Sequence, residues 1–308
     1  MTPATTAMDW TWVWIPATLA AAAAQAGRNA VQRSLTATLG TLGATQVRFL
    51  FGFPFALLFL AIVLAVEGGP VPGAGTGFLL FVLGGAVAQI TATALMLAAM
   101  RERSFVVVTA WTKTEPIQVA LFGFAVLGDP LSATGVVAVL LATLGVVLMS
   151  GNPASAAGRG SLRPALLGLV SGAFFALSAI GFRGAILSLD SGGFVLKATW
   201  TLAWSLGVQT LLLVLWMALF NRALLAACLA AWRASILGGL LGASASQGWF
   251  LGFALTAAAH VRTLGLVEVL FAQVLSRRLF SHATSRRELA GIALIVVGVG
   301  VLLVASAR

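Results

Sequence analysis

Charged residues are scarce in this 308-residue chain, and tyrosine is absent. Only 8% of the residues are charged and 60% are hydrophobic, whereas about a quarter of the residues of a soluble domain are charged. This composition excludes a water-soluble globular protein and predicts one that crosses the lipid bilayer several times. The formal net charge of +10 comes from basic residues in short gaps between apolar runs, not from the basic stripe of a nucleic-acid-binding surface.

Residues that bind metals or act as nucleophiles are equally few. Cys228 is the only cysteine, and His260 and His282 are the only histidines. Neither an intramolecular disulfide nor a histidine–cysteine metal cluster can therefore form. The sequence contains no phosphate-binding loop of the G-x-x-x-x-G-K-[ST] type, which excludes ATP hydrolysis by the chain itself. We therefore expect no cofactor, no bound metal and no enzymatic activity.

Long apolar runs supply the expected membrane spans. A helix needs about 20 apolar residues to cross the hydrocarbon core, because every backbone amide must be satisfied without water. No Lys or Arg precedes the first run, so we expect a retained span rather than a cleaved signal peptide. The fold class is an all-α polytopic membrane protein with ten transmembrane helices, near residues 10–27, 45–66, 77–99, 104–127, 131–150, 164–182, 198–220, 235–258, 263–280 and 289–306.

Short sequence matches occur in the same order in the two halves of the chain. "AGRNAVQRSL" at the end of the first span aligns with "IGFRGAILSL" at the end of the sixth, and "GGAVAQ" in the third with "GASASQ" in the eighth. Glu115 then pairs with Glu268. A unit of five spans is odd, so its second copy enters the membrane from the opposite side. The sequence thus predicts two inverted five-helix repeats, 1–151 and 164–308, joined by a linker at 152–163.

The most informative repeat is "TEPIQVALFGFAVLGDPLSATGVVAVLLATLGVVLMS" (114–150), with its second copy "VEVLFAQVLSRRLFSHATSRRELAGIALIVVGVGVLL" (267–303). It combines a Glu or Pro in the fourth helix, a Gly-acid turn at Gly128-Asp129 and a Gly-rich fifth helix. In this pattern the chain resembles the ten-helix, EamA-type branch of the drug/metabolite transporter superfamily. The resemblance implies inverted five-helix repeats and transport of a small molecule. The second copy departs from the pattern, with Ser281-His282 at the turn.

Basic residues are distributed unevenly between the two sets of loops. The loops after odd-numbered spans hold 13 Lys or Arg residues, Arg28 and Arg48 among them, against four on the other side, namely Arg183, Lys197, Arg262 and Arg308. Because Lys/Arg-rich loops stay in the cytoplasm, the count predicts a multi-pass protein of the cell (inner) membrane with both termini outside. Many members of the family that the chain resembles are thought to keep their termini in the cytoplasm, so the two criteria disagree, and we follow the charge count.

Ionisable residues inside the expected spans are the leading candidates for substrate binding or ion coupling. A charge in the hydrocarbon region costs about 2.5–3.5 kcal/mol on insertion scales, so it usually faces a cavity or a partner. Glu115 and Glu268 are two such residues. Lys113 is poorly placed to pair with Glu115 unless Pro116 breaks the helix, as a proline inside a helix does. These residues either bind a proton or substrate, or form ion pairs that only fix helix packing.

Five polar or aromatic residues complete the candidate site. Helical spacing places Trp111 and Gln118 on the same face of the fourth span as its glutamate. Gln89 and Gln247 occupy matching positions in the two halves, and Trp249 follows shortly after the second. The glutamines either bind substrate or supply hydrogen bonds between helices. The tryptophans either stack on a substrate or pack in the core.

A polar stripe at the end of the first span has two interpretations. Gln25, Arg28 and Gln32 share one side of the helix, with Asn29 and Arg33 beside it. The stripe predicts either a cavity gate, with Arg28 contacting an anion, or an amphipathic helix lying at the lipid headgroups. We favour the second interpretation, because it is the commoner arrangement.

The expected function is secondary active transport of a small polar or amphipathic metabolite, by alternating access and as an exporter. A proton or a counter-substrate would supply the coupling. Lys113 together with the glutamates suits a zwitterion such as an amino acid. The alternatives are efflux of lipophilic cations, which needs the glutamates but not Lys113; a lipid flippase; and a non-transporting membrane partner, in which both glutamates would be paired and no cavity would reach the midplane.

Overall fold

The computed structural model describes residues 10–68, 70–102, 108, 111–130, 132–149, 163–271 and 285–306. The described residues fold into eleven α-helices and three short helical turns, without a strand. The helices are α1 (Trp14–Leu50), α2 (Phe53–Glu67), α3 (Thr76–Glu102), α5 (Glu115–Phe122), α6 (Ala133–Met149), α8 (Arg163–Leu187), α9 (Phe194–Phe220), α10 (Arg222–Ala230), α11 (Trp232–Leu255), α12 (Ala258–Leu264) and α14 (Arg286–Ser306); the turns are η1 (Thr11–Val13), the π-helical η2 (Gly123–Leu127) and η3 (Gly265–Val267).

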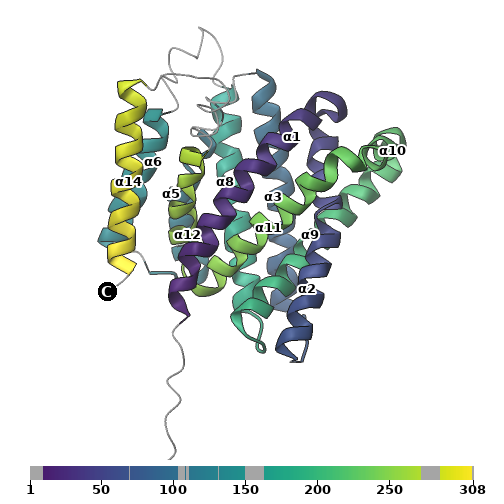
Figure 1. Ribbon diagram of the computed structural model, residues 1–308, viewed down its shortest axis with the longest axis horizontal. Coiled ribbons are helices and arrows are strands. Elements are labelled where there is room, and N and C mark those ends of the chain that lie inside the picture. The colour runs from purple at the N-terminus through teal and green to yellow at the C-terminus, as the bar shows by residue number, and fades with distance from the viewer. Residues whose placement is uncertain are drawn as a thin grey trace, which may run out of the picture.

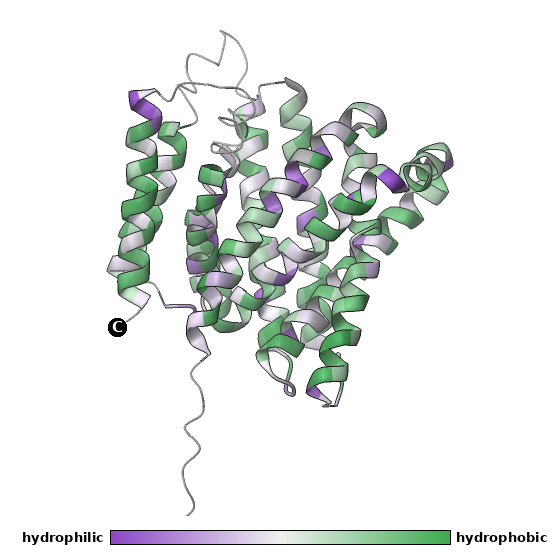
Figure 2. Cartoon of the chain, in the orientation of Figure 1, coloured by the Kyte–Doolittle hydropathy of each residue, from purple (hydrophilic) through white to green (hydrophobic). Residues whose placement is uncertain are grey.

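Many of these helices have the length and composition of membrane spans. Five described stretches qualify alone, and α10 with α11 makes a sixth if the pair, bent by 82°, is one span. Large apolar side chains face outward along them, and α2 and α14 are almost uniformly hydrophobic in Figure 2. The all-α polytopic fold class is thereby confirmed. The five stretches are Ser34–Glu67, Thr76–Met100, Arg163–Leu187, Phe194–Phe220 and Arg286–Ser306.

The helices form a bundle in which the two halves of the chain interleave. The most extensive contacts join α3 to α8, α1 to α11 and α6 to α14. Figure 1 shows α1 crossing the front of the bundle beside α11, with α6 and α14 on one flank and α2 and α9 on the other. Each of these pairs takes one helix from each half, so the middle of the bundle is built from both.

A break inside α1 corrects the first two expected spans. The helix does not end near residue 27 but continues to Leu50, with non-helical backbone at Gly40. Gly40 has a φ of 66°, the left-handed region that residues with a Cβ rarely adopt. Beyond this break the helix changes direction, and Gln32 donates a hydrogen bond to the carbonyl of Ala44 over 3.0 Å. The polar stripe that suggested a helix end is in fact helix interior.

Other differences concern short elements. Helix α10 lies between two expected spans and was not expected; its first turn is capped by the side chain of Asn221, which accepts a hydrogen bond from the amide of Leu224. The fourth and ninth spans are both broken helices. Residues 272–284 of the ninth span and its following turn, and residues 152–162 of the expected linker, lie outside the described part of the chain.

Candidate functional site

Both candidate glutamates follow a helix break. Lys113 and Thr114 form a turn, and α5 begins at Glu115 with Pro116 in its first turn. The predicted break at this proline is thus confirmed. In the second half, α12 gives way to the turn η3, and Glu268 follows directly, at the start of a further α-helical stretch. Interrupted helices near the middle of a bundle place polar backbone and side chains beside a binding site.

Glu268 is the centre of a hydrogen-bonded group. Its Oε2 lies 2.7 Å from Nζ of Lys113 and also accepts a hydrogen bond of 2.7 Å from the amide of Gln25. Its Oε1 accepts a hydrogen bond of 2.8 Å from the amide of Asn29. The glutamate is only 6% exposed, so three donors stabilise a carboxylate that would otherwise be costly to bury.

Glu115 contacts a different cation. Its Oε1 lies 3.1 Å from Nε of Arg262 on α12. The two atoms are within ion-pair distance, but they are not aligned for a hydrogen bond, and neither has another partner among the described residues. The attraction between Glu115 and Arg262 is therefore electrostatic, without the directional bonds that hold Glu268. Arg262 was interpreted from the sequence as a loop residue; the structure corrects this and places it inside the bundle.

Trp249 connects the two ion pairs. Its indole Nε1 donates a hydrogen bond of 3.1 Å to Oε1 of Gln25, which itself holds Glu268. The Arg262 guanidinium lies 5.0 Å from the centre of the Trp249 ring, within cation–π distance. Gly265 makes room for the ring, because a Cβ there would lie 2.6 Å from Cη2 of Trp249. We call this assembly the central charged cluster: Lys113, Glu115, Arg262 and Glu268, with Gln25, Asn29 and Trp249.

The pairing crosses between the halves of the chain. Glu115 of the first half contacts Arg262 of the second, and Glu268 of the second contacts Lys113 of the first. Each carboxylate therefore holds the broken helix of the other half.

Gln89 and Gln247 do not join the central charged cluster. Oε1 of Gln89 accepts a hydrogen bond of 2.5 Å from Gln209 on α9. The amide of Gln247 donates a hydrogen bond of 2.8 Å to the hydroxyl of Thr199, which also lies on α9. These contacts support the interpretation of the two glutamines as hydrogen bonds between helices.

Trp111 and Gln118 both lie against α8. A Cβ on Gly168 of α8 would lie 2.8 Å from Cβ of Trp111, and one on Gly172 would lie 3.7 Å from the amide atoms of Gln118. The turn at residues 113–114 separates Trp111 from α5, which carries both Glu115 and Gln118, so the regular helical face expected for the fourth span is interrupted between Trp111 and Glu115.

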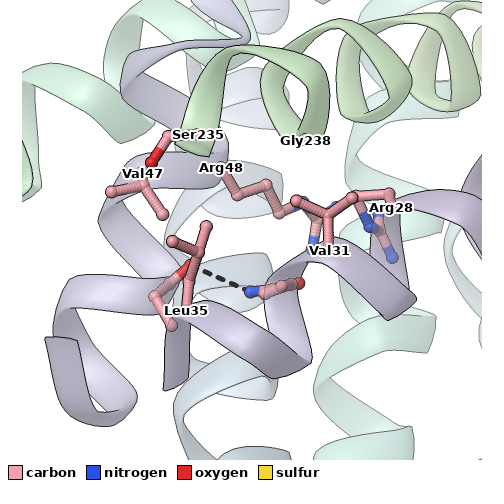
Figure 3. A pocket seen from close by; sticks show the side chains of 9 residues that line it. Arg28, Val31, Leu35, Val47, Arg48, Ser235 and Gly238 are labelled. Carbon is pink, nitrogen blue, oxygen red and sulfur yellow. Dashed lines mark hydrogen bonds between the residues drawn. The ribbon is translucent and has the colours of Figure 1, made fainter. Parts of the chain in front are cut away.

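The polar stripe of the first span points into the protein. Arg28 and Gln32 are 6% and 8% exposed, so the expectation of a helix lying at the headgroups is wrong. Both residues line a pocket between α1 and α11, together with Arg48 from beyond the Gly40 break. Figure 3 shows Arg48 reaching past Gly238 toward Arg28. From the sequence, Arg48 counts among the loop charges, with a cavity-facing position as the alternative, and the structure places it in this pocket.

A third ion pair lies near the end of η2. Arg183 of α8 binds Asp129 through two nitrogens, with Nη2–Oδ1 at 2.8 Å and Nε–Oδ2 at 3.0 Å. Its Nη1 donates to the carbonyls of Phe253 and Thr256 at the end of α11. The acidic residue of the Gly-acid turn thus joins three segments of the bundle.

Comparison with known proteins gives one family and a set of similar folds. The model of the EamA-like transporter family matches residues 12–151. No curated protein matches the chain. The fold matches 29 chains of solved structures. One of them, a crystal structure, aligns with a TM-score of 0.69 and 17% sequence identity over 97% of each chain. At that identity the likeness concerns the fold alone.

Proposed function

This chain belongs to the EamA-like transporter family through residues 12–151, and from that premise we propose that it is a secondary active exporter of a small zwitterionic metabolite such as an amino acid. The family consists of membrane transporters and not of enzymes. Membrane transport of a small molecule by a multi-pass protein is therefore the starting point. The substrate class, the direction and the mechanism are the proposal.

The proposed architecture is ten membrane helices in two inverted repeats, 1–151 and 164–308. The family match ends where the first repeat does. The helix contacts also agree with the repeat. In the repeat, α1 matches α8 and α3 matches α11, so the α1–α11 contact corresponds to the α3–α8 contact, and both are extensive. The α6–α14, α2–α9 and α5–α12 contacts each join two matched helices. Inverted repeats of this kind place the substrate near the midplane, between the halves.

The observation that carries the proposal is the pair of ion contacts between the halves. Lys113–Glu268 and Glu115–Arg262 lie at helix breaks and hold opposite halves together. A substrate ammonium that bound Glu268 would replace the ammonium of Lys113 and release one contact. Alternating access then follows from the exchange of partners, because a ligand shifts a conformational equilibrium by its differential affinity for the two states.

The mixed charge of the cluster distinguishes the candidate substrates. Two cations beside the glutamates, Lys113 and Arg262, repel a lipophilic cation but suit a zwitterion. A non-transporting membrane partner remains the competing candidate, because it also requires both glutamates to be paired, as they are here. Such a protein would move no solute, so transport measurements separate the two.

The decisive experiment measures release of solutes from proteoliposomes. Vesicles containing the full chain are loaded with a mixture of the 20 common amino acids, and the external medium is analysed by mass spectrometry at two pH values. We expect time-dependent release of a subset, with the rate abolished in Glu268→Gln and unchanged in Glu67→Gln, a matched change at an exposed helix end. Equal release from protein-free vesicles and from vesicles with the chain would overturn the proposal.

The proposed orientation places both termini outside the cell. Four of the counted arginines are buried or nearly so, namely Arg28, Arg48, Arg183 and Arg262. Without them the loops after odd-numbered spans still hold 11 basic residues against two.

Single-cysteine variants test this orientation. In a Cys228→Ser background, Ser306→Cys should react with a membrane-impermeant maleimide on intact cells, whereas Ala223→Cys should react only after permeabilisation. The reverse pattern would place the termini inside.

A further inference from the structure

Two arginines far apart along α1 are brought together by its break. In an unbroken helix, 20 residues would separate Arg28 from Arg48 by about 30 Å. The left-handed backbone at Gly40 redirects the chain, and both arginines line one pocket with Gln32, Ser235 and Gly238. The hydrogen bond from Gln32 to the carbonyl of Ala44 fixes the two segments against each other.

The two side chains run side by side under α11. A Cβ on Gly242 would lie 3.4 Å from Cδ of Arg28 and 3.7 Å from Cγ of Arg48. Figure 3 shows Arg48 extending toward Arg28 beneath the stretch of α11 that carries Gly238. The two guanidinium groups therefore lie in the same pocket, although their like charges repel each other.

Neither arginine lies within ion-pair distance of an acidic residue in the described part of the chain, and Glu268, which attracts Arg28 electrostatically, is already paired with Lys113. Arg28 donates to Oδ1 of Asn29 through Nε and Nη2, and its Nη1 is buried without a hydrogen-bond partner among the described residues. Arg48 is 8% exposed, and its guanidinium carbon lies 5.1 Å from the centre of the Phe49 ring. Buried, unpaired cations are costly, so their retention calls for an anionic partner.

The charge balance of the interior leads to the same conclusion. The cluster and the pocket together hold four cations, Arg28, Arg48, Lys113 and Arg262, against the two carboxylates of Glu115 and Glu268. The pocket joins the cluster directly, because Asn29 accepts hydrogen bonds from Arg28 and donates one to Glu268. A solute whose anionic group binds the arginines thus has its other end near the glutamate.

We propose that Arg28 and Arg48 bind the oxyanion group, a carboxylate or a phosphate, of the transported solute. Guanidinium groups suit this role because their donors match the geometry of both oxyanions. The inference rests on the proposed function only in assigning the anion to a transported solute. Binding itself is measured without transport, so the two proposals fail separately.

The test compares anion binding by the purified full chain and by two variants of Arg48. Thermal unfolding in neutral detergent is followed with sodium phosphate or sodium acetate, against sodium chloride at equal ionic strength. We expect a rise in the midpoint on the order of 5 °C for phosphate or acetate at saturation. Arg48→Gln should weaken the apparent affinity at least about tenfold, and Arg48→Lys should restore part of it.

Arg233→Gln is the matched control, because it makes the same change at an exposed position of α11, where the arginine stacks on Trp232 instead of facing the pocket. It should respond to anions as the natural chain does. Equal responses from Arg48→Gln and Arg233→Gln, or no response to either oxyanion, would overturn the proposal.

A lipid headgroup is the other source of the same chemistry. The measurement is therefore repeated in phosphatidylcholine nanodiscs with and without phosphatidylglycerol. We expect the response to soluble phosphate or acetate in both. A response to phosphatidylglycerol alone would overturn the assignment to a soluble solute.

Discussion

The ammonium of Lys113 lies 2.7 Å from Oε2 of Glu268, although 155 positions separate the two residues along the chain. The contact joins the two broken helices, and the side-chain amides of Gln25 and Asn29 donate two further hydrogen bonds to the carboxylate. A buried carboxylate with three donors is stable while it is paired. It can be released by a group that takes the place of Lys113 or by protonation of the carboxylate.

The coupling between Lys113 and Glu268 can be measured by a double-mutant cycle. Lys113→Met leaves Glu268 buried without its countercharge, and we expect this to cost about 3 kcal/mol of unfolding free energy. The double variant Lys113→Met/Glu268→Gln should cost less than Lys113→Met alone, because no uncompensated charge remains. Unfolding is measured in mixed micelles of dodecyl maltoside and dodecyl sulfate. Strictly additive losses would show that the two groups do not interact.

Arg262 should act through its shape as well as its charge. Its guanidinium lies over the rings of Trp249 at 5.0 Å and Phe253 at 5.4 Å while it faces Glu115. Arg262→Lys keeps the charge but loses the planar stacking, which contributes about 0.5–2 kcal/mol. We expect the variant to keep its fold, judged by size-exclusion chromatography, and to lose most amino-acid release in the proteoliposome assay. Release at the natural rate would contradict a role for the stacked geometry.

Sequence reasoning identified part of the central charged cluster and missed its connections. Glu115, Glu268 and Lys113 stood out because charge is rare in apolar runs, and Pro116 indicated the break. The partner of Lys113 could not be predicted, because helical spacing describes one helix and not its rotation against another. Arg262 was assigned to a loop because only local hydropathy was considered. Its burial against the rings of Trp249 and Phe253 depends on how the helices pack, which local hydropathy does not report.

The polar stripe near Arg28 shows the same limit at the level of the fold. A break in hydropathy was taken as the end of a span, whereas the helix continues to Gly40 and turns there. The pocket depends on that single backbone conformation, which brings Arg48 to Arg28. Glycine is common in this chain, with 34 occurrences, so its presence at position 40 did not distinguish a break from close helix packing.

The Asp129–Arg183 pair should be important for stability. The side chains are 13% and 11% exposed, and Arg183 also donates to two carbonyls at the end of α11. Asp129→Asn removes one charge of a two-point contact, and we expect it to lower the unfolding free energy by about 2 kcal/mol. Asp190→Asn, at an exposed position, should change it by less than about 0.5 kcal/mol. Similar losses for the two variants in mixed-micelle unfolding would contradict this role.

The contact between α6 and α14 depends on backbone approach at two glycines. A Cβ on Gly291 would lie 2.6 Å from the carbonyl oxygen of Gly145, and one on Gly145 would lie 2.7 Å from that of Gly291. Gly291→Ala must therefore separate the helices, at a cost of about 1–3 kcal/mol. Gly300, on the same helix, has no heavy atom within 4 Å of an added Cβ, so Gly300→Ala should be neutral or stabilise by up to about 1 kcal/mol through helix propensity. Both are measured by mixed-micelle unfolding, and an equal effect of the two substitutions would mean that the helices do not pack through these glycines.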